Sequence, residues 1–281
     1  MGKAVIAQIV SGLGNQLLEF GTAYAIAKRL GVPLDLDLTW HAKKERAGET
    51  GRAQELTALI PESFYRRTRY YGPIDKRLDR LRKMLTGRET RFGLPIWDAN
   101  PAELEEADAI AAPVYARRVC TDTRIMAPCL PELLPAIRER LFAARMAPRE
   151  DRAFVHVRLG DYRTPEVAKG FVSLGPDWYG RAMRAYEEIT GPTRWVLCSD
   201  EPYDALDMLP GGFDVTVSQA TDTLGDLAVM AAARGGVTAN STFSLWGGLL
   251  SEGGPVVAPE VWRIKKRSPI LPPDWVLIRD G

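Results

Sequence analysis

The sequence predicts an α/β protein with parallel sheets, arranged in two domains. Strand and helix signals alternate over residues 4–38, and the same alternation starts again at residue 153. Strand–helix–strand units of this kind form parallel sheets. A chain of 281 residues is long enough for two domains of about 140 residues each. We place them at 1–148 and 149–281, because proline-rich punctuation precedes the second alternation.

The first domain opens with one complete strand–helix–strand unit. The strand, turn, helix and second strand are expected at residues 4–10, 11–14, 15–30 and 33–38. Leu17, Phe20 and Tyr24 form the apolar stripe of the helix, and Gly31 ends it. Residues 40–100 are charged and predict helices without clear strands. A further helix over 132–142 leads to the domain boundary.

The second domain repeats the alternation. Strands are expected at residues 154–157, 195–198, 215–217, 236–239 and 256–258, the last of which closes the sheet. Helices are expected at residues 177–188, 224–233 and 242–250, the first of them capped by Asp177. The strands are short, apolar runs, as in a sheet that is covered on both faces.

Bulk composition excludes several classes of function. The net charge of +1 gives no overall field for nucleic acid. Three cysteines without a C-x-x-C pair fit neither a disulfide framework nor a zinc site. No signal peptide is visible, and no apolar run approaches the roughly 20 residues that span a bilayer. A cytoplasmic location is therefore expected.

Charge is uneven along the chain. Residues 43–91 contain 14 Lys and Arg against 7 Asp and Glu. Such a segment is either a solvated helical face or a site for an anionic acceptor or a membrane surface. The second alternative would place the protein peripherally at the inner face of the membrane.

Polar side chains directly follow three strands of the second domain. These side chains are Arg158 and Asp161, then Ser199, Asp200 and Glu201, then Asn240, Ser241, Thr242 and Ser244. The carboxyl ends of parallel strands meet at one edge of a sheet, where open α/β sheets bind their ligands. We therefore expect the three clusters to converge on one site.

This edge would suit a diphosphate. A helix opening at Asn240 presents free backbone N–H groups and the positive end of its dipole. The planar guanidinium of Arg158 would supply a full positive charge. The alternative for Arg158 is an ordinary surface pair with Asp161.

The first domain offers a second element that suits an anion, the glycine turn from Gly12 to Gly14, which leads into Asn15 and Gln16 at the start of a helix. Acidic residues follow about 20 residues later, as in a dinucleotide fingerprint, so an NAD-dependent oxidoreductase is one alternative. Leu17 replaces the third glycine of that fingerprint.

We interpret Asp35 and Asp37 as the polar face of a strand rather than as metal ligands, and we therefore expect no catalytic metal. We expect His41 to lie at the surface.

Three segments together resemble the α-1,2-fucosyltransferases of glycosyltransferase family 11, bacterial type. They are Gly-Leu-Gly-Asn-Gln at 12–16, His-Val-Arg-Leu-Gly-Asp-Tyr at 156–162 and Asn-Ser-Thr-Phe-Ser-Leu-Trp-Gly at 240–247. A fourth match is Leu-Cys-Ser-Asp-Glu at 197–201. The matches follow the family's order and extend from about residue 5 to 260.

The resemblance implies a GT-B-like fold, in which two Rossmann-like domains face a central cleft. The first domain would bind mainly the acceptor and the second the donor, GDP-fucose. Transfer to a hydroxyl of an oligosaccharide or lipid-linked glycan, with galactose O2 expected, would invert the anomeric centre and need no metal or other cofactor. Arg158 would bind the diphosphate and Asp226 the guanine edge. The implied donor-binding residues are Gly14, Asn15, Gln16, His156, Arg158, Asp200, Asp226, Asn240, Ser241, Thr242, Phe243 and Ser244.

The catalytic residues expected are Arg158, which stabilises the leaving diphosphate, and Asp161. Asp161 is the first candidate for a base that removes the acceptor proton, although it could instead orient Arg158; Glu19 is the second candidate. Leu159 stands where the family usually has a second arginine, so a transferase of another GDP-sugar is an alternative. A catalytically inactive sugar-nucleotide or glycan-binding module is another.

Overall fold

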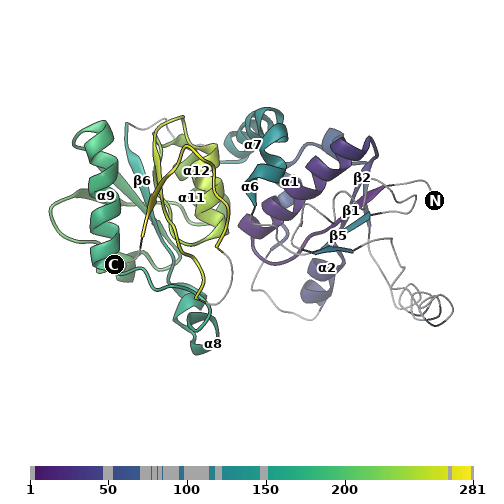
Figure 1. Cartoon of the computed structure of the whole chain (residues 1–281), viewed down its shortest axis with the longest axis horizontal. Helices are drawn as coiled ribbons and strands as arrows, with labels where there is room; N and C mark the ends of the chain where they lie inside the picture. Colours follow the sequence, from purple (N-terminus) through teal and green to yellow (C-terminus); the bar gives the residue numbers. More distant parts are fainter. Residues whose placement is uncertain are drawn as a thin grey trace. The chain divides into compact units, whose positions relative to one another are not determined.

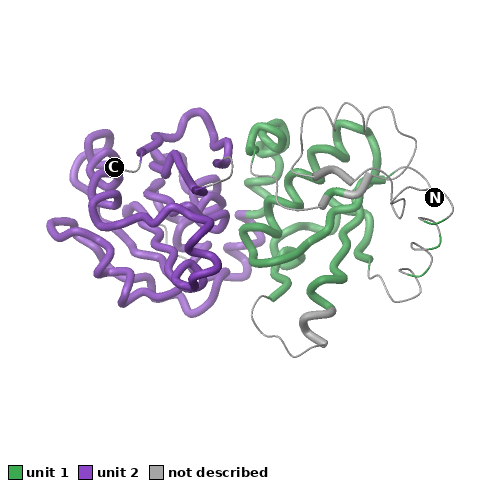
Figure 2. Tube along the Cα trace, turned by 60° about the horizontal axis from the view of Figure 1, so that its bottom comes forward, with its two compact units in different colours: residues 1–137 green, residues 138–281 purple. Residues whose placement is uncertain are grey.

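The computed structural model divides into two compact units (Figure 2). Unit 1 is Met1–Ile137 and unit 2 is Arg138–Gly281, so the division falls inside helix α7 (Leu130–Ala144). The domain boundary expected after residue 148 stays a prediction. The structure describes residues 4–46, 53–69, 77, 81, 84, 95–97, 114–117, 122–145, 151–264 and 268–279.

Unit 1 contains a parallel sheet that has five strands among its described residues, in the order β3-β2-β1-β5-β4. The strands are β1 (Val5–Gln8), β2 (Leu34–Asp37), β3 (Arg67–Arg69), β4 (Pro95–Trp97) and β5 (Val114–Arg117). Helix α1 (Leu13–Leu30) connects β1 to β2 and ends at Gly31, whose φ of 60° is left-handed. The strand–helix–strand unit expected here is thus present.

Shorter helices complete the described part of unit 1. They are α2 (Thr39–Arg46), α3 (Leu56–Leu59), η1 (Glu62–Phe64), α6 (Thr123–Met126) and η2 (Ala127–Cys129), before α7. The apolar side of α1 is fully buried, with Leu17, Leu18 and Phe20 inaccessible to solvent. This burial fixes the loop between β1 and α1 against the core of the unit.

Unit 2 contains a parallel sheet of six strands among its described residues, in the order β11-β10-β9-β6-β7-β8. They are β6 (Ala153–Val157), β7 (Arg194–Ser199), β8 (Asp214–Val217), β9 (Gly236–Val237), β10 (Val256–Pro259) and β11 (Val276–Ile278). The helices are η3 (Gly160–Arg163), α8 (Pro165–Ala168), α9 (Pro176–Thr190), α10 (Pro202–Leu206), α11 (Thr223–Ala232) and α12 (Thr242–Leu250).

Helices cover both faces of this second sheet. Figure 1 shows α9 on one face and α11 with α12 on the other. Under α9, the side chains of Val155, Val157 and Trp195 pack with Trp178 and Met183 in one hydrophobic cluster. Because both faces are covered, β6 and β7 consist mostly of apolar residues, and clusters of polar residues follow where the strands end.

Three expectations about the elements are wrong. Residues 40–100 contain strands β3 and β4, and β11 lies outside the strand that was expected to close the second sheet. Strands β3, β4 and β11 are edge strands of only three residues each, too short to show a period-two pattern. Helix α9 begins at Pro176 with Gly175 at the cap position, not Asp177, since proline fits the first turn of a helix.

The interpretation of two polar residues in unit 1 is also wrong. Asp35 is fully buried rather than on an exposed face, because Arg69 on the unexpected neighbour β3 and Arg66, directly before that strand, donate to its carboxylate. These two arginines lower the pKa of Asp35 against the opposing effect of burial. His41 is buried, 7% exposed, with its ring 4.7 Å from that of Trp40.

Candidate functional site

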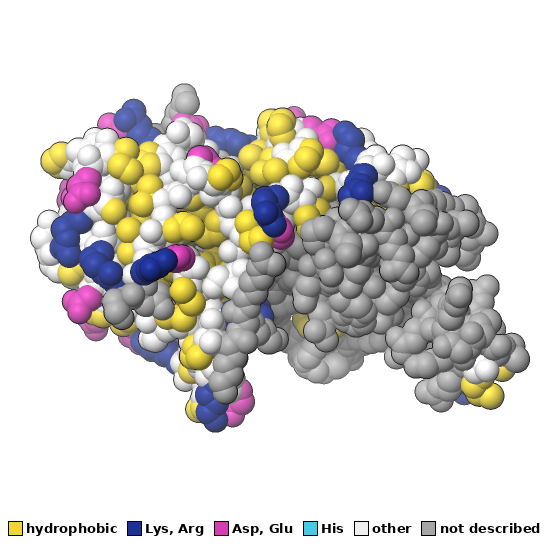
Figure 3. Space-filling view, in the orientation of Figure 1, with side chains coloured by type: hydrophobic (Ala, Val, Ile, Leu, Met, Phe, Trp, Pro, Cys, Tyr) yellow, Lys and Arg dark blue, Asp and Glu magenta, His cyan; other side chains and the backbone are white. Residues whose placement is uncertain are grey.

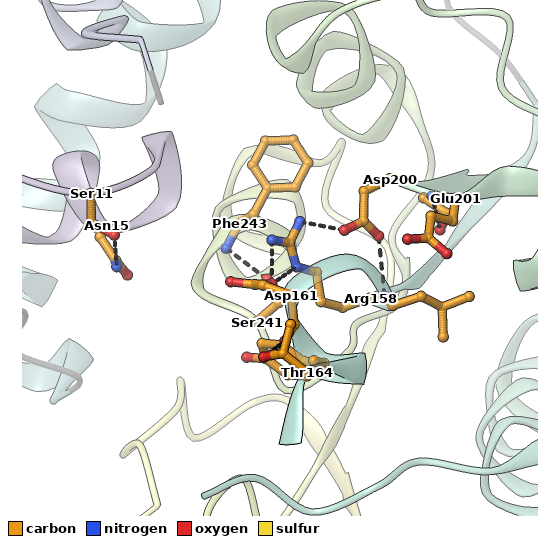
Figure 4. A network of polar contacts seen from close by, with 12 residues as sticks. Ser11, Asn15, Arg158, Asp161, Thr164, Asp200, Glu201, Ser241 and Phe243 are labelled. Carbon is orange, nitrogen blue, oxygen red and sulfur yellow. Dashed lines mark hydrogen bonds and ion pairs between the residues drawn. The ribbon is translucent and has the colours of Figure 1, made fainter. Parts of the chain in front are cut away.

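The three polar clusters of unit 2 lie at the edge of the sheet where β6, β7 and β9 end. The strands run parallel, with Val157 opposite Ser199 and Val155 opposite Val237. Arg158 therefore leaves β6 beside the start of the Asp200 turn, while the chain beyond β9 enters α12. The structure brings these clusters together as the topology predicts (Figure 4).

The guanidinium of Arg158 lies between two carboxylates in this cluster. Its Nη2 is 2.7 Å and its Nε 3.2 Å from Oδ1 of Asp161, and its Nη1 is 2.9 Å from Oδ2 of Asp200. The side chain is 27% exposed, so it is accessible to a ligand. A guanidinium carries five N–H hydrogens, and these two carboxylates do not use all of them.

Tyr162 joins the turn after β6 to the segment after β9. Its hydroxyl donates to the carbonyl of Asn240 at 2.8 Å, and its ring packs against Phe171 with centroids 4.5 Å apart. The Arg158 guanidinium lies 6.0 Å from the centre of the same ring. Tyr162 lies in the 156–162 motif, but no sequence pattern predicts its contact with a residue 78 positions further along the chain.

Helix α12 begins directly at the site. Ser241 caps it by accepting from the backbone N–H of Phe243 at 3.3 Å, and Thr242 is its first residue. In Figure 4, Ser241 and Phe243 lie beside Arg158 and Asp161. The end of a helix that presents N–H groups is thus next to a partly exposed guanidinium, which suits an anion.

Two predicted donor-binding side chains at this helix are bound to the backbone instead. The Asn240 amide donates to the carbonyl of Val172 at 2.7 Å. Ser244 is fully buried, and its hydroxyl contacts the backbone of Ala239 and Ser241. Both side chains shape the loop, and a contact with a ligand would have to come from their backbone.

His156 is enclosed beside this cluster, only 3% exposed. Burial, with the nearby positive charge of Arg158, lowers the pKa of His156 to about 3, so its imidazole is neutral at neutral pH. Its Nδ1 has no hydrogen-bond partner among the described residues, and its ring lies 5.7 Å from that of Phe243. A neutral buried imidazole of this kind can accept or donate one hydrogen bond.

Asp226 lies in the first turn of α11. Its Oδ1 accepts from the hydroxyl of Ser218 at 2.8 Å. Burial raises the pKa of Asp226 to about 6, and the carboxylates of Asp222 and Asp200 add to this effect. Asp222 caps the same helix by accepting from the backbone N–H of Gly225 at 2.7 Å. Asp226 is therefore a carboxylate whose charge changes just below neutral pH.

The predicted residues of unit 1 form the turn between β1 and α1. Gly12 is the N-cap residue of α1, Gly14 lies buried in its first turn, and Ser11 has a φ of 67°, which is uncommon for a residue other than glycine. Asn15 donates to the hydroxyl of Ser11 at 3.1 Å. Gln16 is fully buried; its amide donates to two backbone carbonyls and accepts from two backbone N–H groups.

Glu19, the second candidate base, is buried under the same turn. It is 3% exposed, and its Oε2 accepts from the N–H of Val10 at 2.8 Å. Burial raises the pKa of Glu19 well above that of a carboxyl in water, against the smaller effect of this hydrogen bond. It is closed off within unit 1, whereas Asp161 is at the surface of unit 2.

Leu159, where the family pattern has a second arginine, faces inward. It is 8% exposed and belongs to the hydrophobic cluster under α9, and its N–H donates to Oδ1 of Asp200 at 3.1 Å. The chain therefore uses this position for packing and for a backbone contact rather than for a second cation.

Much of the basic segment 43–91 and of the expected acceptor region lies outside the described residues. The face of unit 2 shown in Figure 3 exposes basic, acidic and hydrophobic side chains together. Among the residues that the structure describes, no group of three His, Cys, Asp or Glu side chains is arranged to hold a metal. None of the helices in the described ranges is long and apolar enough to cross a membrane.

Comparisons with known proteins agree with this architecture. No protein-family model matches the sequence. The O-antigen biosynthesis glycosyltransferase WbnK of Escherichia coli is 32% identical over 114 residues, which make up 38% of this chain and 38% of WbnK. The chain thus matches little more than a third of that relative.

Solved structures resemble the chain over more of its length. The NodZ α-1,6-fucosyltransferase, soaked with GDP-fucose, superposes with a TM-score of 0.50 at 16% identity over 89% of this chain and 93% of NodZ. The E. coli heptosyltransferase WaaC with ADP gives 0.48 at 13% identity, over 99% and 93%. The likeness to NodZ confirms the predicted fold class, an α/β fold with parallel sheets similar to GT-B glycosyltransferases. The central cleft between the domains stays a prediction.

Proposed function

We propose that this protein is a glycosyltransferase that transfers L-fucose from GDP-fucose to a hydroxyl group of a glycan. The observation that carries the proposal is the partly exposed Arg158 beside the first turn of α12, at the ligand-binding edge of a parallel sheet. The motifs quoted above support fucose as the sugar and galactose O2 as the acceptor hydroxyl. The partial match to WbnK supports a glycan acceptor of the O-antigen type.

The reaction needs a group that stabilises the negative charge developing on the leaving diphosphate. Breaking the bond between the anomeric carbon and GDP leaves an oxocarbenium-like sugar and an increasingly negative diphosphate. The guanidinium of Arg158 and the backbone N–H groups at the start of α12 would stabilise that charge, so we propose a reaction that needs no metal. Attack of the acceptor oxygen from the opposite face would invert the anomeric centre.

The proposed recognition of the guanine ring of GDP depends on Asp226. A carboxylate can accept from both N1–H and N2–H of guanine. Adenine lacks this pair of donors, because its N1 is an acceptor and it has no 2-amino group. Asp226 is partly buried at the start of α11, so a guanine edge would meet it with little competition from water. This arrangement favours GDP over ADP.

The structure favours an orienting role for Asp161 over the role of base. Its Oδ1 accepts from two nitrogen atoms of Arg158, so this oxygen faces the guanidinium and is already occupied by it. We therefore propose that Asp161 holds Arg158. The acceptor proton would leave to water or to a group outside the described residues.

Leu159 supports a second candidate, a transferase that uses another GDP-sugar. Because this side chain is packed inside the hydrophobic cluster, it offers the sugar no charged group, and the sugar pocket would then differ from that of proteins with arginine here.

We propose a cytoplasmic enzyme, with peripheral membrane association through the basic segment 43–91 where the acceptor is lipid-linked.

Ligand binding and GDP release test the proposal. We expect GDP and GDP-fucose to raise the melting temperature, GDP-mannose to raise it less, and NADH to leave it unchanged. Release of GDP should depend on an added acceptor oligosaccharide. Stabilisation by NADH instead would indicate an oxidoreductase, and binding without any GDP release would indicate a binding module.

Substitution of Arg158 tests the assignment of the site. Removing one charged donor from a developing anion costs about 3–4 kcal/mol, or about 10²–10³ in rate, so Arg158→Ala should lose transfer while the protein stays folded. Arg234→Ala is the matched control, since Arg234 pairs with Asp151 on the surface. Near wild-type turnover in Arg158→Ala would contradict the assignment.

A further inference from the structure

Arg158 is held from two sides by carboxylates that come from different loops. Asp161 lies three residues further along the chain in η3, whereas Asp200 follows the neighbouring strand β7. Asp161 takes the Nε and Nη2 side of the guanidinium and Asp200 the Nη1 side. Contacts on different nitrogens fix the plane of the group as well as its position (Figure 4).

Gly160 makes the contact with Asp200 sterically feasible. A Cβ atom at this position would lie 2.1 Å from Oδ2 and 3.1 Å from Cγ of Asp200. The same oxygen, Oδ2, is the one that pairs with Arg158. Any side chain at residue 160 would therefore push the carboxylate away from the arginine.

The backbone also holds Asp200 in this orientation. Its other oxygen, Oδ1, accepts from the N–H of Leu159 at 3.1 Å. One carboxylate thus binds the backbone directly after Arg158 and the Arg158 side chain itself. The side chain of Asp200 is 26% exposed, so both contacts are partly shielded from water.

The charge balance argues against a direct contact between Asp200 and a diphosphate. One guanidinium and two carboxylates together carry a surplus negative charge, which opposes the binding of an anion. What Asp200 adds to the site is the orientation of Arg158 rather than attraction of a ligand. A group with that effect acts on the reaction step more than on ground-state binding.

We propose that Asp200 is a positioning residue that fixes the guanidinium of Arg158 for the transition state, with Gly160 as the residue that makes room for it. This inference rests on the proposed function, in which Arg158 binds the donor diphosphate. It replaces the expectation that Asp200 itself contacts the donor.

Asp200→Asn is the test, because the amide oxygen can still accept from the N–H of Leu159 while the charge facing Arg158 is lost. We expect kcat to fall about tenfold, and the dissociation constant for GDP, measured by calorimetry, to stay the same or decrease. Gly160→Ala should show the same division between kcat and GDP affinity. Circular dichroism and melting curves check that both variants are folded.

Glu201→Gln is the matched control. Glu201 is the next carboxylate in the same turn, but it pairs with Arg163 at 2.7 Å rather than with Arg158. Its removal changes the local charge equally, so we expect kcat close to that of the wild type. Similar values of kcat for Asp200→Asn and Glu201→Gln would overturn the positioning role.

Two further outcomes separate this proposal from the proposed function. Weaker GDP binding by Asp200→Asn with an unchanged kcat would show that Asp200 contacts the donor, which overturns the positioning role alone. If wild-type protein binds neither GDP nor GDP-fucose, the proposed function itself fails. In an Arg158→Ala background, Asp200→Asn should not lower the residual transfer rate further, because the residue to be positioned is gone.

Discussion

The hydroxyl of Tyr162 donates to the carbonyl oxygen of Asn240 at 2.8 Å, and this contact ties two strand ends of unit 2 together. Tyr162 belongs to η3, the turn that follows Arg158, and Asn240 precedes α12. The arginine and the start of the helix come from segments about 80 residues apart in the sequence. A single side chain therefore helps to keep the two proposed diphosphate-binding elements in register.

Tyr162→Phe should loosen this link without removing the ring contact to Phe171. A lost hydrogen bond to a backbone carbonyl costs about 1 kcal/mol of the free energy of unfolding. We expect a loss of that size in urea denaturation and a severalfold lower kcat. Tyr203→Phe is the control, since Tyr203 is 82% exposed. Unchanged stability and kcat in Tyr162→Phe would contradict the link.

Binding of GDP should depend on pH through Asp226. Burial raises the pKa of this carboxyl to about 6, and only the ionised form accepts from both N–H groups of guanine. The affinity for GDP should therefore be constant above pH 7 and fall about tenfold between pH 7 and 5, since the charged fraction falls accordingly. Calorimetric titrations at several pH values would measure it.

Asp226→Asn is the variant that checks this assignment. An amide offers one acceptor and one donor, so it should bind GDP weakly at pH 7.5 and without the dependence on pH. Inosine diphosphate, which lacks the 2-amino group, should lose less affinity on the substitution than GDP does. Equal affinities of the variant and the wild type for GDP would exclude Asp226 from guanine recognition.

The convergence of Arg158, Asp200 and Asn240 could be predicted from the sequence. Each follows an apolar strand, and parallel strands end at the same edge of a sheet. The contact between Asp200 and Arg158 could not, because it depends on β7 being the direct neighbour of β6. Strand order is a tertiary property, and the short turns after the strands carry no pattern that specifies it.

The burial of Asp35 could not be predicted from the sequence either, because it also depends on which strand lies beside β2. Alternation along β2 placed this carboxylate on a polar face, and burial of a charge without partners is costly. The partners are Arg69 on β3 and Arg66 directly before it, and β3 is an edge strand too short to recognise. The surroundings of Gln16 could not be predicted for a related reason, since three of the four backbone groups that hydrogen-bond its amide lie about 40 residues further along the chain.

Gln16 should therefore be a determinant of stability. Its amide bridges the turn after β1 and the segment before α3 through hydrogen bonds with Ser11, Ala53, Glu55 and Leu56. Gln16→Leu would leave these backbone groups unpaired in a buried place, at a cost of about 3 kcal/mol. Asn15→Ala, at the partly exposed neighbouring position, should cost less than about 1 kcal/mol. Equal denaturation midpoints for the two variants would contradict the bridge.

The dependence of stability on pH should reveal two opposing titrations in unit 2. The pKa of buried His156 is lowered to about 3, so stability falls as the pH decreases from 6.5, where the unfolded state begins to take up the proton. The pKa of Asp226 is raised to about 6, so stability increases as the pH decreases from 6 to 3.8. Between pH 6 and 4 the two effects nearly cancel.

Asp226→Asn should make the effect of His156 on the pH dependence of stability measurable. Without the opposing carboxyl, we expect the variant to lose about 2 kcal/mol more than the wild type between pH 6 and 4, since one pKa unit corresponds to 1.36 kcal/mol. At pH 7.5 it should be more stable than the wild type, because a buried negative charge has been removed. Asp214→Asn, an exposed carboxylate on β8, should follow the wild-type curve. Urea denaturation at each pH measures the difference, and parallel curves for Asp226→Asn and the wild type would show that Asp226 does not bind its proton more tightly in the folded protein than in the unfolded chain.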